Sequence, residues 1–167
     1  MTDPILADIF RLSKALLETA SEKGVTIGVV ESCTGGLLGA AITAMPGSSS
    51  VFQGGFLTYS NTLKQKLVGV SEDTLRAYGA VSEETASEMA TGARERLGVD
   101  LVVSITGVAG PGGGSPEKPV GTVCFGLATK NGVTTETQLF ADLSRNRVRD
   151  YAVMHAMTQL NEAAAQA

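Results

Sequence analysis

Apolar residues in the first part of the chain follow helical spacing and then strand spacing. Between Ile5 and Leu16 they recur every three or four positions, which predicts an amphipathic helix over residues 5–22. Gly24 follows, and glycine is the residue type that most often ends a helix. The β-branched run VTIGVV over 25–30 then predicts a short buried strand.

The rest of the chain alternates in the same way. The Asn-Gly pair in the turn 130–132 is a strong hairpin signal between the last two strands. Ser82, which is followed by two acidic residues, is a typical helix N-cap. The strands are therefore expected over 56–60, 101–106, 122–129 and 134–141, and the helices over 37–45, over 61–69, from Ser82 and after Ser144.

This order of elements predicts the fold class. Helix–strand crossover units joined to a hairpin imply a mixed sheet with helices on both faces. We therefore expect an α/β fold, a three-layer α/β/α sandwich with a mixed central sheet. The chain shows neither an internal repeat nor a linker of changed composition, so a single domain over 1–167 is expected.

Composition narrows the classes of partner. Apolar residues make up 43% of the chain and charged residues 18%, which is typical of a compact globule. The formal charge of −4 lacks the basic excess of a nucleic-acid-binding surface, and no apolar run approaches the roughly 18 residues of a membrane span. We expect no nucleic-acid or membrane partner, and a cytoplasmic location, since the N-terminus lacks the basic start of a secretory signal. Base rates among soluble chains favour a homo-oligomer, a dimer above all.

The cysteines and the single histidine give no sign of a metal site. Cys33 and Cys124 lie far apart in the sequence, as expected of two reduced thiols in a cytosolic protein. Together with His155 they show no metal-ligand spacing. We expect neither a metal nor a cofactor.

The segment ESCTGG lies where the strand over 25–30 should pass into the next helix. Such a junction exposes free backbone N–H groups, and the glycines at 35 and 36 let a ligand approach the backbone closely. Ser32 there could act as a nucleophile, with the amides after it holding an oxyanion. The alternative is a phosphate-binding turn in which Ser32 is a plain N-cap.

A serine nucleophile needs a base, and His155 is a poor candidate. It lies in the middle of the last predicted helix, where a lone histidine is usually a surface or core residue. Lysine is the usual replacement when partial burial lowers its pKa. Lys64 and Tyr59 lie across a predicted strand-to-helix turn and could face one cleft. The alternative is that Lys64 and Lys66 are solvated charges on a helix.

Two further loops are candidate ligand sites. GSSS over 47–50 could bind a phosphate through Ser48 and Ser49, supply a rival nucleophile, or form a plain capping turn. The loop from Gly107 to Gly114 lacks the Gly-Lys-Ser/Thr ending of a Walker loop and the following helix of a dinucleotide fold. It remains either a ligand loop beyond a strand's carboxyl end or a long solvent loop.

Three arginines gather at the start of the last predicted helix, in LSRNRVR over 143–149. Positive charge is unfavourable at a helix N-terminus, and a bound phosphate would relieve that cost, with Arg145 nearest to the helix start. Ion pairs with Asp142 and Asp150 explain the same charges equally well.

Together these segments resemble one protein family. ESCTGG, GSS, FLTYSNTLKQKLVGV, GAVSEETA, SITGVAGPGGGSPEKPVGTV and SRNRVR are similar to the CinA C-terminal domain family, over about residues 5–160. The resemblance implies a nicotinamide-nucleotide amidase, which hydrolyses the carboxamide of nicotinamide mononucleotide to nicotinic acid mononucleotide and ammonia in NAD recycling. Longer family members carry an additional N-terminal domain, so this chain is expected to be a stand-alone deamidase.

The resemblance also implies roles for individual residues. The family is described as serine hydrolases with a lysine partner, so the catalytic residues carried over are Ser32, Lys64, Tyr59 and Ser48. The oxyanion is expected on the backbone amides near Thr34 to Gly36, and the phosphate of the nucleotide substrate on Arg145. The substrate contacts expected are Glu31, Thr34, Gly35, Gly36, Ser49, Gly107, Gly110 and Arg145.

Two other functions remain open at this point. A non-catalytic nucleotide- or phosphate-binding module, associated with competence, would explain the glycine loops and the arginines. A phosphohydrolase would liberate phosphate instead and would usually require a metal. Ser48 also remains a rival to Ser32 as the nucleophile.

Overall fold

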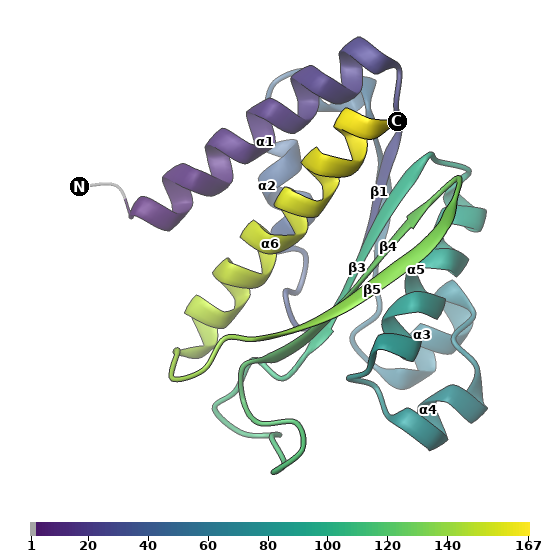
Figure 1. Cartoon of the computed structure of the whole chain (residues 1–167), viewed down its shortest axis with the longest axis vertical. Coiled ribbons are helices and arrows are strands. Elements are labelled where there is room, and N and C mark those ends of the chain that lie inside the picture. The colour runs from purple at the N-terminus through teal and green to yellow at the C-terminus, as the bar shows by residue number, and fades with distance from the viewer. Residues whose placement is uncertain (1–2) are drawn as a thin grey trace.

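The chain folds into a five-stranded sheet with helices on both faces (Figure 1), in a computed structural model that describes residues 3–167. The helices are α1 (Pro4–Lys23), α2 (Leu37–Thr43), α3 (Asn61–Val68), α4 (Glu72–Tyr78), α5 (Glu83–Leu97) and α6 (Arg145–Gln166), with one 3-10 turn, η1 (Ser48–Ser50). The strands are β1 (Ile27–Glu31), β2 (Phe52–Leu57), β3 (Leu101–Gly107), β4 (Thr122–Thr129) and β5 (Gly132–Leu139).

The sheet is mixed, as the sequence predicts. Its strand order is β2-β1-β3-β4-β5. The first three strands along the chain run parallel, with Glu31 of β1 level with Leu57 of β2 and Ile105 of β3. β4 is antiparallel to both β3 and β5, and Thr129 pairs with Gly132 across the predicted hairpin turn. The carboxyl ends of β1, β2 and β3 therefore lie at one edge of the sheet.

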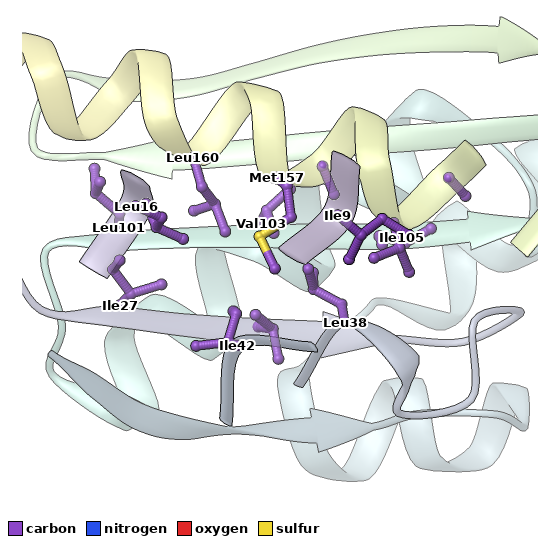
Figure 2. Packing of buried hydrophobic residues seen from close by; sticks show 14 of the residues in the cluster. Ile9, Leu16, Ile27, Leu38, Ile42, Leu101, Val103, Ile105, Met157 and Leu160 are labelled. Atoms are coloured by element: carbon purple, nitrogen blue, oxygen red, sulfur yellow. The ribbon is translucent and has the colours of Figure 1, made fainter. Parts of the chain in front are cut away.

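The helices form the two outer layers. Figure 1 shows α1, α2 and α6 on one face of the sheet and α3, α4 and α5 on the other. The larger core cluster lies under α1, α2 and α6, where Leu16, Ile42 and Met157 are fully buried against β1 and β3 (Figure 2). A smaller cluster around Met89 and Val102 fills the space under α3 and α5. The predicted three-layer sandwich is confirmed.

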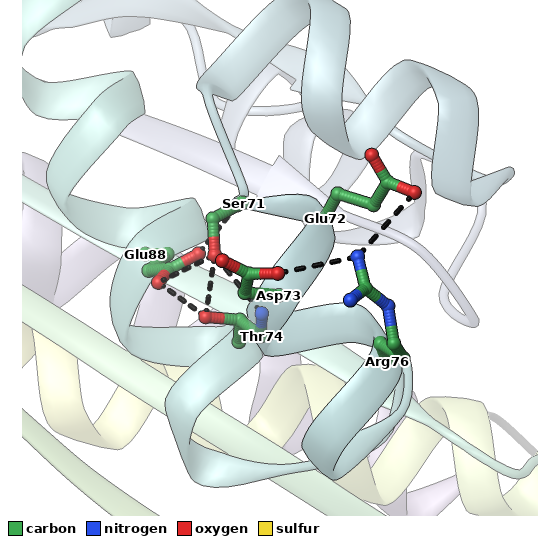
Figure 3. A network of polar contacts seen from close by, with 6 residues as sticks. All are labelled: Ser71, Glu72, Asp73, Thr74, Arg76 and Glu88. Carbon is green, nitrogen blue, oxygen red and sulfur yellow. Dashed lines mark hydrogen bonds and ion pairs between the residues drawn. The ribbon is translucent and has the colours of Figure 1, made fainter.

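Serine side chains begin four of the helices. Ser60, Ser71, Ser82 and Ser144 each accept a hydrogen bond from the backbone N–H three residues later. At α4 the cap is reinforced, because Glu88 of α5 accepts from the Ser71 N–H at 2.7 Å and from the Thr74 hydroxyl at 2.6 Å (Figure 3). The predictions that Ser82 is a cap and that the last helix begins after Ser144 are both confirmed.

Two local predictions differ from the structure. The strand expected over 56–60 is β2, which begins earlier, at Phe52, and ends at Leu57. The sequence does not predict this earlier start, because Gly54 and Gly55 lower the strand propensity of the segment. Yet Gly55 suits its place, because a Cβ there would lie 2.5 Å from the Val29 side chain of β1. Helix α4, over 72–78, was not predicted.

Across residues 3–167 no helix combines the length and the apolar character needed to cross a bilayer.

Candidate active site

The site forms where β1, β2 and β3 end. Ser32 directly follows β1, and its N–H donates to the Ile105 carbonyl of β3 at 3.0 Å. Thr58 directly follows β2, and its N–H donates to the Glu31 carbonyl at 2.8 Å. Gly107 ends β3 at the same edge. Ser32 and Gly107 therefore lie at strand ends, as predicted. Open α/β sheets bind ligands beyond the carboxyl ends of their parallel strands.

Lys64 reaches Ser32 from the helix that follows β2. Its Nζ lies 3.0 Å from Ser32 Oγ and donates to the Thr58 carbonyl at 2.8 Å. Lys64 is 1% exposed and Ser32 is 8% exposed, so the amine is buried while the serine lies just beneath the surface. The alternative of Lys64 as a solvated helix charge is thus wrong, whereas Lys66 is exposed.

Burial changes the chemistry of this amine. Removal from water disfavours the charged form and lowers the pKa of Lys64 from 10.5 to about 8. No carboxylate within residues 3–167 lies within ion-pair distance of Lys64 to oppose this effect. A substantial fraction of the amine is therefore neutral near physiological pH, and a neutral amine can accept the Ser32 proton.

The neighbouring thiol is much less reactive. Cys33 is buried, and loss of hydration raises the pKa of its thiol from 9.0 to about 11. Cys33 and Cys124 are both free and both buried. The Ser32 hydroxyl, 3.0 Å from the Lys64 amine, is thus the better candidate nucleophile of the two side chains.

The turn between Ser32 and helix α2 leaves two backbone amides available. The Gly35 N–H donates to the Ser32 carbonyl at 3.1 Å, and the Gly36 N–H donates to the Glu31 carboxylate at 3.0 Å. For the N–H groups of Cys33 and Thr34 no acceptor on another residue is found among residues 3–167. Of the amides expected to hold the oxyanion, those of Gly35 and Gly36 are therefore already bonded within the protein, whereas the amide of Thr34 and the neighbouring amide of Cys33 are not.

Glu31 does not line the site as a substrate contact, contrary to the prediction. Its side chain is 2% exposed, and both carboxylate oxygens accept hydrogen bonds from the start of α2. Because strand β1 alternates its side chains, Glu31 points beneath α2 rather than into the opening. The glycines that follow have backbone roles, since Gly35 and Gly36 adopt positive φ angles of 62° and 93°.

Arg145 meets two of the other predicted residues. Its guanidinium donates to the Gly110 carbonyl at 2.8 Å and to the Tyr59 hydroxyl at 3.1 Å. The side chain thus links α6, the loop after β3 and the segment after β2 across the open edge of the sheet. Tyr59 is exposed and contacts Arg145, so the structure gives its phenol no hydrogen bond to Lys64 or Ser32. Asp142 and Asp150, the alternative partners, are not within ion-pair distance of Arg145.

Arg149 is a site residue that the sequence analysis did not single out. It lies one helical turn after Arg145 and donates to the Thr34 carbonyl at 2.9 Å. Arg147, between them, pairs with Asp3 at 2.7 Å and with Asp150 at 3.8 Å, so the alternative of an ion pair with Asp150 holds for this arginine. The spacing of four residues between Arg145 and Arg149, which places them on one helix face, was the available signal. Two guanidinium groups with neutral partners therefore flank the Ser32 turn.

Ser48 and Ser49 lie away from this site, which corrects both predictions. They belong to η1, which precedes β2, and the first residue of β2 pairs with Ile27 at the start of β1. Ser32 follows the other end of β1. The length of the strand, about 13 Å at 3.3 Å per residue, thus separates the two serines from the Ser32–Lys64 pair in this chain.

His155 also lies elsewhere. Its ring packs on Phe125 with 4.6 Å between centroids, and its Nε2 is 2.6 Å from the Glu136 carboxylate. Among residues 3–167 no cluster of three or more His, Cys, Asp or Glu side chains could hold a metal ion. Two surface cavities, of about 410 and 600 Å³, are lined by other residues than the Ser32–Lys64 pair.

The fold and the site together define a class of protein: a three-layer α/β sandwich with a serine–lysine pair at the carboxyl edge of its parallel strands. Residues 10–164 match the family described as the CinA C-terminal domain, and the chain belongs to this family. The resemblance noted from the sequence motifs is therefore confirmed.

Known proteins agree with this assignment. The chain is 50% identical over 144 residues to a CinA-like protein from Chlorobaculum tepidum, covering 83% of this chain and 34% of that protein. It is 49% identical over 150 residues to a CinA-like protein from Synechococcus sp. (strain CC9902), covering 89% and 36%. The chain thus spans about a third of the length of these curated relatives.

Solved structures share the whole fold. The crystal structure of the competence/damage inducible protein CihA from Agrobacterium tumefaciens superposes with a TM-score of 0.90 at 41% identity, covering 92% of this chain and 93% of that one. A CinA superfamily protein from Escherichia coli gives a TM-score of 0.88 at 37% identity, covering 96% and 91%. This chain thus covers both solved chains almost completely.

Proposed function

We propose that this chain is an amidohydrolase that deamidates nicotinamide mononucleotide, forming nicotinic acid mononucleotide and ammonia. One observation carries the chemical part of the proposal: a buried amine with a lowered pKa lies 3.0 Å from the hydroxyl of Ser32. The nicotinamide part follows from the family resemblance of the sequence motifs. The absence of a basic excess, with a net charge of −4, supports a small-molecule substrate rather than a nucleic acid.

The reaction starts with Lys64 as the general base. In its neutral form the amine donates one N–H to the Thr58 carbonyl, at 2.8 Å, and can turn its lone pair to Ser32 Oγ, 3.0 Å away. The amine takes the hydroxyl proton as Ser32 Oγ bonds to the carboxamide carbon. The carbonyl oxygen becomes an oxyanion, which the free N–H groups of Cys33 and Thr34 stabilise.

The second half of the reaction returns the enzyme to its starting state. The protonated Lys64 gives its proton to the leaving nitrogen, so that the C–N bond breaks and ammonia departs. Water then attacks the acyl-enzyme ester with Lys64 again as the base, and the ester oxygen of Ser32 recovers its proton. The net reaction adds one water to the carboxamide and yields a carboxylate and ammonia.

The arginines of α6 supply the charge that an anionic nucleotide needs. Among residues 3–167 the acceptors of Arg145 and Arg149 are all neutral: the Gly110 and Thr34 carbonyls and the Tyr59 hydroxyl. A phosphate could displace or join these weaker partners through charge-assisted hydrogen bonds. The exposed Tyr59 ring at the same opening is available to contact the base or sugar. Gly107 and Gly110 remain candidate backbone contacts.

A direct assay tests the proposal. Purified protein is incubated with nicotinamide mononucleotide, and ammonia and nicotinic acid mononucleotide are quantified, with and without chelator. We expect both products in equal amounts, and no turnover by Ser32→Ala. Ser48→Ala is the matched control, because Ser48 lies at the opposite end of β1. Binding of the nucleotide without ammonia release would favour the non-catalytic module, and phosphate release would favour the phosphohydrolase.

A further inference from the structure

Glu31 is a buried carboxylate with no basic partner. Among residues 3–167 no Lys, Arg or His side chain lies within ion-pair distance of it. Its charge is met by three backbone N–H groups instead. Gly36 and Leu38 donate to Oε2 at 3.0 and 3.1 Å, and Gly39 donates to Oε1 at 2.8 Å. Without such donors, burying the carboxylate would be strongly unfavourable.

These bonds account for the start of helix α2. The first turn of a helix has N–H groups without partners inside the helix, and an anionic ligand often binds there. Here Glu31 takes the N–H groups of Gly36, Leu38 and Gly39, while the Leu37 N–H donates to the Thr34 carbonyl at 3.3 Å. No N–H at the start of α2 is left for a substrate.

We propose that Glu31 is a positioning residue that determines where the oxyanion binds. By occupying the start of α2, it leaves the two amides directly after the nucleophile, those of Cys33 and Thr34, as the available donors. Its hydrogen bonds also join the end of β1 to the start of α2, and the turn that carries Ser32 lies between these two points. This inference rests on the proposed function, because it assigns the oxyanion of that reaction.

The position of Glu31 in the chain explains why such a tie is needed. Ser32 is the next residue, so a shift of the turn moves the nucleophile directly. The turn contains Gly35 and Gly36, both at positive φ, and glycine has little intrinsic preference for this conformation over others. Hydrogen bonds from outside the turn must therefore fix it. Ile105 and Lys64 hold Ser32, Arg149 holds the Thr34 carbonyl, and the Glu31 carboxylate holds the end of the turn at Gly36.

Glu31→Gln is the most direct test. Glutamine has the same shape but only one acceptor oxygen, and its NH₂ group would face at least one backbone N–H. Glu88→Gln is a matched control, because Glu88 also accepts hydrogen bonds from the start of a helix, but of α4 rather than α2 (Figure 3). Both variants are measured for kcat, KM, the pH profile of kcat and thermal unfolding.

We expect Glu31→Gln to lower kcat by about 10- to 100-fold, as loss of oxyanion stabilisation does. KM should change by less than about threefold, and the pH midpoint set by Lys64 should stay where it is, because the substrate-binding groups and the base are untouched. Glu88→Gln should lose thermal stability and keep its kcat. An unchanged kcat in folded Glu31→Gln would overturn the proposal, as would a raised KM at full kcat, which would place Glu31 on the substrate.

A second measurement does not depend on the activity. Amide hydrogen exchange of Gly36, Leu38 and Gly39 should be slow in the wild type and at least about tenfold faster in Glu31→Gln. Retained protection would overturn the inference even if the protein has no amidase activity, and wild-type inactivity with these protection changes would reject only the proposed function. If Glu31→Gln does not fold, Glu31→Asp retains the charge but shortens the side chain, and the same loss of kcat and protection is expected.

Discussion

Lys64 and Ser32 are 32 residues apart in sequence, yet the amine of one lies 3.0 Å from the hydroxyl of the other. Parallel pairing of β1 with β2 brings the ends of these strands side by side, so Ser32 and Thr58 become neighbours. Ser60 then begins α3 within two residues of Thr58, and Lys64 lies in its first turn. The serine–lysine pair is thus a consequence of one strand pairing and one helix cap.

The pH dependence of activity should report the ionisation of Lys64. The proposed reaction requires the neutral amine, and burial lowers the pKa of Lys64 to about 8. The value of kcat/KM should therefore rise with pH and level off above a midpoint near pH 8. Initial rates of ammonia release between pH 6 and pH 10 measure this midpoint. A midpoint near 10.5, the ordinary value for lysine, would contradict the assignment of Lys64 as the base.

The same pKa predicts how stability varies with pH. Below about pH 8 the amine is protonated in both the folded and the unfolded state, so Lys64 adds no pH dependence. Above that value the folded state releases the proton first, and the unfolded state binds more protons. The free energy of unfolding should therefore rise by about 1 kcal/mol between pH 8 and pH 9.

Lys64→Met isolates this contribution. Urea unfolding at pH 7, 8 and 9 should show the rise for the wild type and not for the variant. The variant should also be the more stable protein at pH 7, because it buries no charge. The comparison ends at pH 9. Above this value the thiol of Cys33, whose pKa burial raises from 9.0 to about 11, loses its proton first in the unfolded state and so makes an opposite contribution to stability. Parallel curves for the two proteins would show that Lys64 is not the titrating group.

Substrate charge should be recognised through Arg145. Replacing it with alanine removes charge-assisted hydrogen bonds worth about 1.5–3 kcal/mol, so KM for nicotinamide mononucleotide should rise by roughly 10- to 100-fold. Arg147→Ala is the control, since Arg147 pairs with Asp3 away from the site. Nicotinamide riboside, which lacks the phosphate, distinguishes the loss of a phosphate contact from a general loss of activity. If Arg145 binds the phosphate, its loss should hardly alter turnover of the riboside.

The sequence predicted the elements of the site better than their roles. Regular periodicity and serine caps identified the helices, and the end of a buried strand placed Ser32 correctly. The roles of Glu31 and of the oxyanion donors could not be predicted, because they depend on which amides at the start of α2 are already bonded. These hydrogen bonds depend on where the Glu31 side chain points at the end of β1. The spacing of residues in the sequence does not show which amides it reaches.

Ser48, Ser49 and Arg149 show the limits in another way. GSSS looked like a ligand loop by composition, but parallel pairing of β2 with β1 places it at the edge opposite Ser32. Arg149 belongs to the arginine-rich run over 143–149, but only the packing of α6 beside the Ser32 turn brings it to the Thr34 carbonyl. Both outcomes are set by topology, and local patterns do not contain that information.

The support of Lys64 by the helix next to it can be tested at Gly92. This residue of α5 lies against the end of α3, where a Cβ would be 1.8 Å from the Val68 carbonyl oxygen. The contact is to backbone, so no side chain can move aside and α3 must shift. Gly92→Ala should therefore destabilise the protein by about 1–3 kcal/mol, although alanine is ordinarily favoured over glycine in a helix by about 1 kcal/mol.

A shift of α3 would also displace Lys64, so Gly92→Ala should lower kcat by about 100-fold, the cost of a misplacement near 1 Å. Thr91→Ala is the control, because Thr91 is the exposed neighbour of Gly92 on the same helix. Urea unfolding and the ammonia assay on the same preparations measure both effects. A destabilised Gly92→Ala with full activity would mean that the position of Lys64 does not depend on the packing of α3 against α5.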